Sequence, residues 1–201
     1  MEYSDFLDKH SGGKILVCGC GKSMDLLNNP GDFVTVGVND IGRKFTPNYL
    51  VLLNNQHGYK GDRWQYVYGA KAPVIFTHLK DLNIIAKNNI VTFKLGTFGS
   101  LNLDERTKVD YSSNSPYVAC IIAYHMGAKN IGMIGVDFTN DHFFEKTGRH
   151  PLAGRLTVIV REYDSLHKEL KKRGVNLYNL SPDSIIKSVP YKSITDFQNG
   201  L

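Results

Sequence analysis

The segment Asn114–Phe138, with the sequence NSPYVACIIAYHMGAKNIGMIGVDF, joins a helix signal to a strand signal and decides the fold class. Asn114 or Ser115 is suited to cap a helix, and Pro116 suits its first position, where a backbone N–H would have no partner within the helix. Gly127 is placed to end this helix in a left-handed conformation. The helical spacing of the apolar residues predicts one buried face, made by Val118, Ile121, Ile122 and His125.

A short apolar run, Ile131–Val136, follows this helix after a polar turn. A continuous apolar run of this length is typical of a strand buried in a parallel sheet. Asp137 follows it, at the sheet edge where open α/β folds bind ligands. Its carboxylate could face such a ligand or could hydrogen-bond nearby backbone N–H groups, and the sequence leaves both roles open.

Further strands and helices alternate along the chain. The predicted strands are Lys14–Cys18, Phe33–Val38, Asn48–Leu53, Val74–Thr77, Ile90–Lys94 and Val175–Leu180, the predicted helices are Met24–Asn28, Leu79–Ala86 and Arg155–Arg173, and Leu95–Ser113 is expected to be an irregular loop. Such alternation implies a mostly parallel sheet with right-handed crossovers. We therefore expect residues 1–201 to form one Rossmann-like α/β domain in three layers, with a lid at residues 139–154 after the strand end at 136–138.

The composition is that of an ordinary globular protein, with 201 residues and 42% hydrophobic content. No apolar run approaches membrane-spanning length, and Met1–Asp5 is too polar to begin a signal peptide. The three cysteines are expected to be buried free thiols, so we expect a cytoplasmic protein. The formal net charge of +5 suits an anionic ligand. Nucleic acid is not expected, because the basic run at 168–173 fits a solvated helix end, and a homo-oligomer stays open.

The turn after the first predicted strand contains half of a dinucleotide-binding fingerprint, but neither its third glycine nor the spacing of a P-loop. Its small residues would let a phosphate approach backbone N–H groups, although a plain tight turn is the alternative. The candidate nucleotide-binding residues here are Gly19, Cys20, Gly21, Lys22 and Ser23. Asn39 and Asn54 end the next two strands, where their amides could bind a base or ribose or could cap loops.

The polar segment 139–154 is long for a simple connection, and loops of this length are often lids. His142 and His150 titrate near neutrality, while Arg149 and Arg155 carry fixed positive charge. Such groups suit a general base beside an anionic leaving group, although histidines in a solvated loop are as often incidental.

No metal site is expected from the sequence. It contains no Asp-x-Asp motif and no His and carboxylate spacing of a metal site, and the pair Cys18 and Cys20 lacks the second pair that a structural zinc site needs. Aromatic residues near Trp64, including Tyr59, could stack on a base, but core packing is the commoner explanation.

The order of these motifs resembles that of family 42 bacterial sialyltransferases and of the related domain in Maf-type flagellin glycosylation proteins. Residues 19–24 look like the family's Gly-x-Gly-x-Ser-Leu turn, and residues 127–138 look like its Gly-x-Lys-x-Ile-x-x-x-Gly-Ile-Asp-Phe block. Residues 175–184 are similar to its closing strand and Pro-Asn-Ser segment. Asn39 and Asn54 fall where the family has donor-binding asparagines, and His150 falls near its general base. In place of the two tyrosines that stabilise the departing phosphate, this chain has Thr139 and either His142 or Phe143.

The resemblance implies a metal-independent, inverting glycosyltransferase that moves a sugar from a CMP-sugar-like donor to a hydroxyl acceptor, with no cofactor. The turn at 19–23 and the Asn114-Ser115 pair, which matches the family's Thr-Ser pair, would hold the nucleotide. Asp137, Thr139 and Arg155 would complete the nucleotide site. His150 would accept the proton of the acceptor hydroxyl, with Arg149 and His142 balancing charge on the leaving phosphate.

Two other functions stay open at this point. The same domain type also resembles the archaeal 6-hydroxymethylpterin diphosphokinase, which implies a magnesium-dependent phosphotransferase. Few carboxylates are available to hold the metal. A nucleotide-binding module that has lost catalysis is the third hypothesis.

Overall fold

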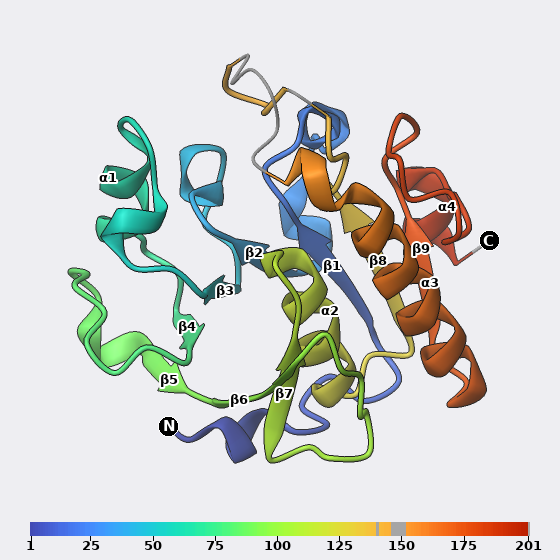
Figure 1. Ribbon diagram of the computed structural model, residues 1–201, viewed down its shortest axis with the longest axis horizontal. Helices are drawn as coiled ribbons and strands as arrows, with labels where there is room; N and C mark the ends of the chain where they lie inside the picture. Colours follow the sequence, from blue (N-terminus) through green and yellow to red (C-terminus); the bar gives the residue numbers. More distant parts are fainter. Residues whose placement is uncertain (140, 146–151, 201) are drawn as a thin grey trace.

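A seven-stranded parallel sheet with helices on both faces organises the computed structural model, which describes residues 1–139, 141–145 and 152–200 (Figure 1). The strands are β1 Lys14–Cys18, β2 Val34–Val38, β3 Tyr49–Leu52, β4 Val74–Thr77, β5 Ile90–Thr92, β6 Lys94–Phe98, β7 Lys108–Tyr111, β8 Asn130–Ile134 and β9 Asn176–Asn179. The α-helices are α1 Arg63–Tyr68, α2 Ser115–His125, α3 Leu156–Lys172 and α4 Ile194–Asn199. Short 3-10 helices are η1 Tyr3–Phe6, η2 Lys22–Leu26, η3 Pro30–Asp32, η4 Ile41–Arg43, η5 Gln56–Gly58, η6 Lys87–Asn89 and η7 Ala153–Arg155.

The strand order β5-β4-β3-β2-β1-β8-β9 places β1 at a reversal of the chain's direction across the sheet. From β1 the chain moves outward through β2 to β5, and it then returns to pair β8 with the other side of β1. Neighbouring crossovers diverge at such a reversal, which opens a crevice at the carboxyl ends of the strands. The fold therefore predicts a ligand site beyond β1 and β8.

The sheet separates two hydrophobic cores. Ile15 and Val17 of β1 point into the core that also holds α2 and α3, while Leu16 and Cys18 point into the core that holds η2, α1 and α4. All four side chains are fully buried, because successive residues of a strand face opposite sides and both sides are covered. The predicted three-layer Rossmann-like α/β fold is confirmed, and its main sheet is entirely parallel.

Helix α2 begins and ends where the sequence predicts. The Asn114 side chain caps it by accepting a hydrogen bond from Tyr117 N at 3.1 Å, and Gly127 follows it with φ of +86°. The helix is buried on nearly all sides rather than on one face, because it packs on β1, β2 and β3 and is itself covered by β7.

Two predicted helices are wrong. The segment Leu79–Ala86 is irregular, because the N–H of Ile85 bonds to the carbonyl of Tyr68 at 3.0 Å instead of forming a helical bond. Leu82 and Ile84 are buried in it while Ile85 is 68% exposed, so burial does not follow helical spacing. Over Met24–Asn28 the predicted α-helix is replaced by the last residues of the 3-10 helix η2, which ends at Leu26.

The prediction of an irregular loop over Leu95–Ser113 is also wrong, because most of β6 and all of β7 lie in it and pair as a separate parallel two-stranded sheet. The Asp110 carboxylate on β7 accepts hydrogen bonds from the N–H groups of Thr97, at 2.7 Å, and Asn102, at 2.8 Å. A side chain at Gly96 would place Cβ only 2.0 Å from Asp110 Oδ1, so this glycine makes the pairing possible.

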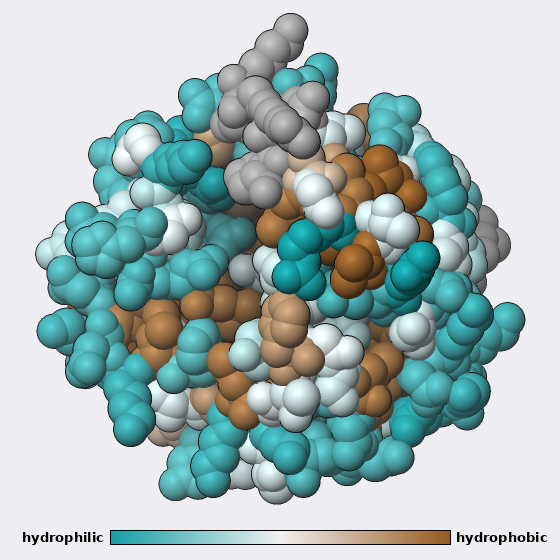
Figure 2. Space-filling view, in the orientation of Figure 1, coloured by the Kyte–Doolittle hydropathy of each residue, from teal (hydrophilic) through white to brown (hydrophobic). Residues whose placement is uncertain are grey.

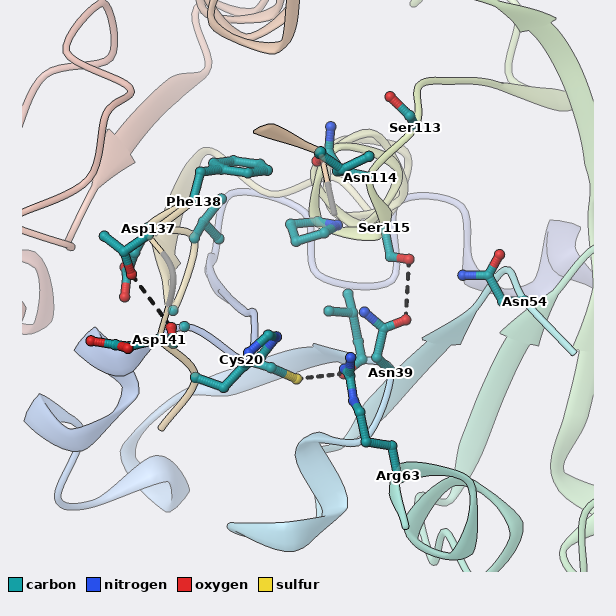
Figure 3. A pocket seen from close by; sticks show the side chains of 18 of the residues that line it. Cys20, Asn39, Asn54, Arg63, Ser113, Asn114, Ser115, Asp137, Phe138 and Asp141 are labelled. Atoms are coloured by element: carbon teal, nitrogen blue, oxygen red, sulfur yellow. Dashed lines mark hydrogen bonds between the residues drawn. The ribbon is translucent and has the colours of Figure 1, made fainter. Parts of the chain in front are cut away.

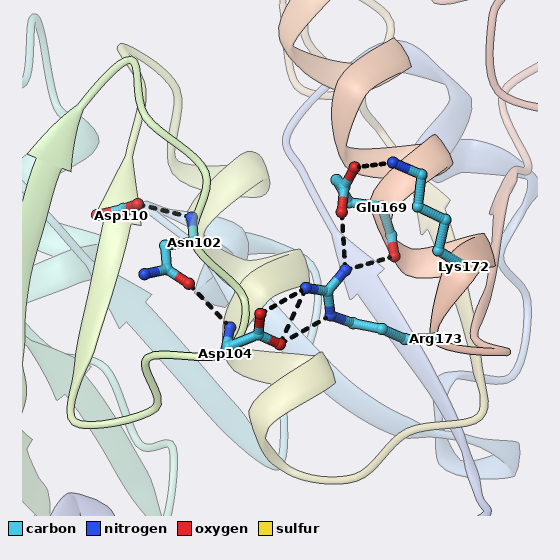
Figure 4. Close-up of polar contacts among 6 residues, drawn as sticks. All are labelled: Asn102, Asp104, Asp110, Glu169, Lys172 and Arg173. Carbon is cyan, nitrogen blue, oxygen red and sulfur yellow. Dashed lines mark hydrogen bonds and ion pairs between the residues drawn. The ribbon is translucent and has the colours of Figure 1, made fainter.

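The connection between β6 and β7 is fastened to the end of α3 (Figure 4). Arg173 donates to both oxygens of Asp104, at 2.9 and 3.0 Å, and to Oε2 of Glu169 at 2.8 Å. Lys172 donates to the other oxygen of Glu169 at 2.6 Å. The network ties this connection, whose Leu103 is buried in the main core, to a long helix. Among the described residues, no helix combines the length and the apolar character needed to cross a membrane.

Candidate active site

A cavity of about 240 Å³ lies at the carboxyl ends of β1, β2, β3 and β8, beside the start of α2. Figure 2 shows the molecule hollowed on this face, between the surface over α1 and the surface over α3. Its lining includes Cys20, Gly21, Asn39, Asn54, Tyr59, Arg63, Ser113, Asn114, Ser115, Gly135, Asp137, Phe138, Thr139, Asp141, His142 and Leu152. In Figure 3 the amides of Asn39 and Asn54 and the hydroxyls of Ser113 and Ser115 lie on one side of the cavity. Asp137, Phe138 and Asp141 lie on the other side (Figure 3).

The glycines after β1 have a packing role against the turn that follows β8. Gly19 N donates to Ile134 O and Gly21 N donates to Gly135 O, both at 2.8 Å. A Cβ on Gly19 would lie 2.2 Å from Gly135 O, and one on Gly21 would lie 2.6 Å from Asp137 Oδ2. The half fingerprint therefore has a structural explanation, the close approach of two turns, and only Cys20 and Gly21 of residues 19–23 line the cavity.

Asp137 stabilises the turn that follows β1, residues 19–23. Its buried carboxylate, 3% exposed, accepts hydrogen bonds from Ser23 N at 2.7 Å and from Ser23 Oγ at 2.5 Å. The Ser23 hydroxyl in turn accepts from Gly135 N at 2.8 Å and lies 2.6 Å from Ser181 Oγ. Of the two roles that the sequence left open for Asp137, the structure shows the hydrogen bond to a backbone N–H, although this residue also borders the cavity.

Asn39 joins three elements around the cavity. Its Oδ1 accepts hydrogen bonds from Ser115 Oγ on α2 and from the Tyr59 hydroxyl, each at 3.2 Å. Two of the three non-glycine residues with positive φ in the described part of the chain, Asn39 at +53° and Phe138 at +55°, line this cavity. Such strained conformations gather at functional sites.

The polar side chains at the start of α2 differ in whether they are already hydrogen-bonded within the fold. The Asn114 side chain is engaged in the fold, because Oδ1 also accepts from the Tyr163 hydroxyl at 2.8 Å and Nδ2 donates to Ser112 Oγ at 2.8 Å. By contrast, Ser113 Oγ is buried with no hydrogen-bond partner among the described residues. Asn54 is exposed at the rim of the cavity. Ser115 and Asn54 are therefore better placed than Asn114 to bind a ligand through side chains.

Arg63 is a cavity residue that the sequence did not predict. Its Nε donates to Oδ2 of Asp40 at 2.9 Å, and a second bond joins its terminal nitrogen to Oδ1. Asp40 is fully buried and also forms an ion pair with Arg43, whose Nε lies 3.4 Å from Oδ2. Cys20 Sγ lies 3.6 Å from the same carboxylate. Burial of the Cys20 thiol is the main cause that raises its pKa well above the ordinary value, and the negative charge of Asp40 raises it further. Arg63 is 23 residues from Asp40, so no local pattern could reveal the pair.

Residues 141–145, which belong to the predicted lid, contact the turn after β1. His142 lines the cavity and pairs with Gly21 in an antiparallel bridge, while Phe143 N donates to Cys20 O at 3.1 Å. The Arg43 guanidinium lies between two rings, 4.0 Å from that of Tyr66 and 4.1 Å from that of Phe144. These contacts anchor residues 142–144 beside the cavity.

The remaining predicted site residues have different positions. Thr139 lines the cavity, and its hydroxyl donates to Asp141 O at 3.4 Å. Arg155 lies outside the lining and places its guanidinium 5.1 Å from the Phe98 ring centre. Lys22 is exposed and also outside the lining. The predicted catalytic residues His150 and Arg149 lie outside the described residues.

The described residues contain no group of three or more His, Cys, Asp and Glu side chains that could hold a metal ion. Two of the candidate carboxylates have other partners, since Asp40 binds arginines and Asp137 binds Ser23. The prediction of a site without metal stays a prediction.

Comparison of the sequence finds no matching family model and no similar curated protein. Comparison of the structure finds the sialyltransferase CstII from Campylobacter jejuni, solved in complex with the substrate analogue CMP-3FNeuAc, with a TM-score of 0.55 and 14% identity over 90% of this chain and 86% of that one. The monofunctional alpha-2,3-sialyltransferase Cst-I from the same organism has a TM-score of 0.51 and 15% identity, over 90% and 80% of the two chains. The MAf glycosyltransferase from Magnetospirillum magneticum AMB-1 has a TM-score of 0.58 and 13% identity, over 97% of this chain and 36% of that one. The resemblance read from the sequence is thus confirmed as a likeness of structure: the chain has the fold of these glycosyltransferases.

Proposed function

We propose that this protein is a glycosyltransferase that transfers a sugar from a nucleotide-activated, CMP-sugar-like donor to a hydroxyl acceptor. The observation that carries the proposal is the cavity at the sheet reversal, where Asn39, Asn54 and Ser115 present amides and a hydroxyl from three elements. The similar fold of a sialyltransferase solved with a CMP-sugar analogue supports a nucleotide-sugar as the ligand of this cavity.

The proposed nucleotide site uses the start of α2. This helix of 11 residues directs its N-terminal partial positive charge toward the cavity, which favours a phosphate. Because Asn39 Oδ1 accepts both neighbouring hydroxyls, its amide N–H groups are left to donate to the nucleotide or the sugar. Asn54, at the rim, would bind the more exposed part of the donor.

The proposed reaction is a single displacement with inversion. The acceptor oxygen attacks the anomeric carbon from the face opposite the nucleotide, and the bond from that carbon to the phosphate oxygen breaks. The electron pair of the broken bond leaves with the nucleotide, and the acceptor proton goes to His150, the base assigned by the resemblance. Charge on the leaving phosphate is balanced by the α2 N-terminus, with His142, Arg149 and Arg155 as further candidates.

Arg63 is given a positioning role in this proposal. Its guanidinium borders the cavity but forms a bidentate pair with buried Asp40, so the positive charge is already compensated. The pair fixes the end of β2, which directly carries Asn39. We expect Arg63 to hold the donor site in shape.

The test is a thermal-shift panel of CMP, UDP, GDP, ADP and ATP, each with magnesium or with EDTA, followed by incubation with the sugar donor of the nucleotide that binds. Ligands of the native state raise the melting temperature by mass action. The proposal predicts a shift with CMP in EDTA, and release of CMP from a CMP-sugar under the same conditions. A shift with ATP and magnesium alone would replace it by the phosphotransferase hypothesis, and binding without turnover of any donor would leave a nucleotide-binding module.

A further inference from the structure

Two further cavities lie in a row beside the candidate site. A cavity of about 280 Å³ shares Asn54, Ser113 and Ser115 with the site, and a third of about 820 Å³ shares His78 and Leu95 with the second. The shared lining residues place the three cavities side by side, from the candidate site to the space between β5, β6 and the N-terminal segment, which lie next to one another in Figure 1. We call the second and third cavities together the side groove.

The near part of the side groove has apolar and polar walls suited to a sugar ring. Phe98 and Tyr111 lie edge to face with ring centres 5.3 Å apart. The Arg155 guanidinium lies 5.1 Å from the Phe98 ring centre, and Phe98 remains 45% exposed. Ser113 Oγ, at the wall shared with the donor site, is buried without a partner among the described residues. A pyranose has an apolar C–H face and a rim of hydroxyls, so an exposed ring beside an unpaired hydroxyl matches both of its surfaces.

His78 lines both the near and the far part of the side groove. Its Nδ1 is buried with no hydrogen-bond partner among the described residues, and its ring lies 6.4 Å from that of Phe93. Burial lowers the pKa of His78, so the ring is neutral at pH 7 and can donate or accept a hydrogen bond. An unpaired neutral group suits an uncharged hydroxyl of a chain that passes through.

The far part of the side groove carries positive charge. Lys80, Lys94 and Arg106 line it, together with one carboxylate, that of Glu2. Arg106 is held by Asp8, through two hydrogen bonds of 2.9 Å. Lys80 and Lys94 are exposed and have no ion pair within the described ranges 1–139, 141–145 and 152–200. Their two uncompensated ammonium groups therefore favour an anionic occupant.

We propose that the side groove binds an elongated, acidic oligosaccharide acceptor. Its terminal hydroxyl reaches the donor site past Ser113, one sugar ring lies on Phe98, and a carboxylate or phosphate further along the chain lies against Lys80 and Lys94. The role of this oligosaccharide as acceptor rests on the proposed glycosyltransferase function, but its binding in the side groove is testable without turnover.

The test compares two probes by calorimetric titration at low salt, a neutral hexose trisaccharide and the same trisaccharide with a phosphate monoester at its reducing end. The groove predicts tighter binding of the phosphorylated probe by the wild-type protein. The double variant Lys80→Gln/Lys94→Gln should weaken that binding by roughly tenfold and leave the neutral probe unchanged. Phe98→Ala should weaken both probes. The double variant Lys168→Gln/Lys171→Gln removes two exposed lysines of α3 outside the groove, of which Lys168 is paired with Asp164, and should change neither.

Equal affinity of the wild-type protein for the two probes, or an equal loss in the two double lysine variants, would overturn the proposal. Release of CMP from the donor with water as acceptor is measured in parallel, and Lys80→Gln/Lys94→Gln should leave its rate unchanged. A wild-type protein that binds the phosphorylated probe but releases no CMP would contradict the proposed function and keep the groove.

Discussion

The hydroxyl of Ser115 donates to Oδ1 of Asn39 over 3.2 Å, and this bond joins the first turn of α2 to the end of β2. The same oxygen accepts from Tyr59, so the orientation of the Asn39 amide is fixed before any ligand arrives. A donor site with a fixed amide loses less conformational entropy on binding than a mobile one. The two hydrogen bonds place Asn39 at the centre of the candidate site.

Replacing Asn39 by glycine should remove the side-chain amide without changing the backbone conformation. Glycine accepts the φ of +53° without strain, so the fold should be retained while the nucleotide loses its amide partner. We expect the dissociation constant for CMP to rise by roughly tenfold, as for the loss of about one hydrogen bond. Calorimetric titration measures it, with Asn83→Gly, at an exposed asparagine outside the cavities, as the control. Unchanged affinity in Asn39→Gly would remove this residue from the donor site.

Replacing Gly19 by alanine should destabilise the protein through the two packed turns. The new Cβ would lie 2.2 Å from Gly135 O, a backbone atom that cannot move without disturbing β8. Overpacking of this kind costs about 1–3 kcal/mol or more. The matched control is Gly31→Ala, whose Cβ would have no heavy atom within 4 Å and should change the free energy of unfolding by less than about 1 kcal/mol. Urea denaturation of both variants provides the comparison, and equal midpoints would refute the packing role.

The stability of the protein should fall in mild acid because of His125. Burial, aided by the charge of Arg106 and opposed by Asp8 and Glu105, lowers the pKa of His125 from 6.5 to about 4. Between these values the unfolded chain binds a proton that the native protein does not, so the free energy of unfolding decreases as pH falls through this window, by up to about 3 kcal/mol. His125→Gln should show a smaller decrease between pH 6.5 and 4 in urea denaturation. An identical pH dependence in the variant would show that His125 does not carry the effect.

The ion pair between Arg173 and Asp104 should stabilise the β6–β7 pair only modestly. Its geometry is bidentate, but Asp104 is largely exposed, so a double-mutant cycle with Arg173→Ala and Asp104→Ala should give a coupling of about 0.5–1 kcal/mol. Hydrogen exchange of the β6 and β7 amides should accelerate in both single variants. A coupling near zero would show that the contact in Figure 4 has no energetic role.

The parts of the fold that the sequence predicts are those with a strong local signal. The run Ile131–Val136 overlaps β8 at Asn130–Ile134, and the Asn114 cap and Gly127 bracket α2. The β6–β7 pair escapes prediction because β6 lacks apolar alternation and β7, which alternates, is only 4 residues long. The carboxylate of Asp110 on β7 stabilises the pairing by accepting a hydrogen bond from Thr97 N on β6. Leu79–Ala86 has helix-like spacing, but contacts with Tyr68 and the core decide its path.

The candidate site shows the same division. Asn39 and Asn54 are found from their positions at strand ends, because parallel strands bring their carboxyl ends to one edge. Arg63 and the packing role of Gly19 depend on contacts with Asp40 and Gly135, residues remote in the sequence. No periodicity marks such pairs, so they become visible only in three dimensions.

The most direct test of the account is the rate of CMP release from a CMP-sugar in EDTA, by the wild-type protein and by His150→Ala. We expect turnover without metal in the wild type, a decrease by roughly two to four orders of magnitude in His150→Ala, and near-normal turnover in His167→Ala, a histidine of α3 outside the cavity. No release by the wild-type protein from any CMP-sugar, or release that EDTA abolishes, would contradict a metal-independent glycosyltransferase.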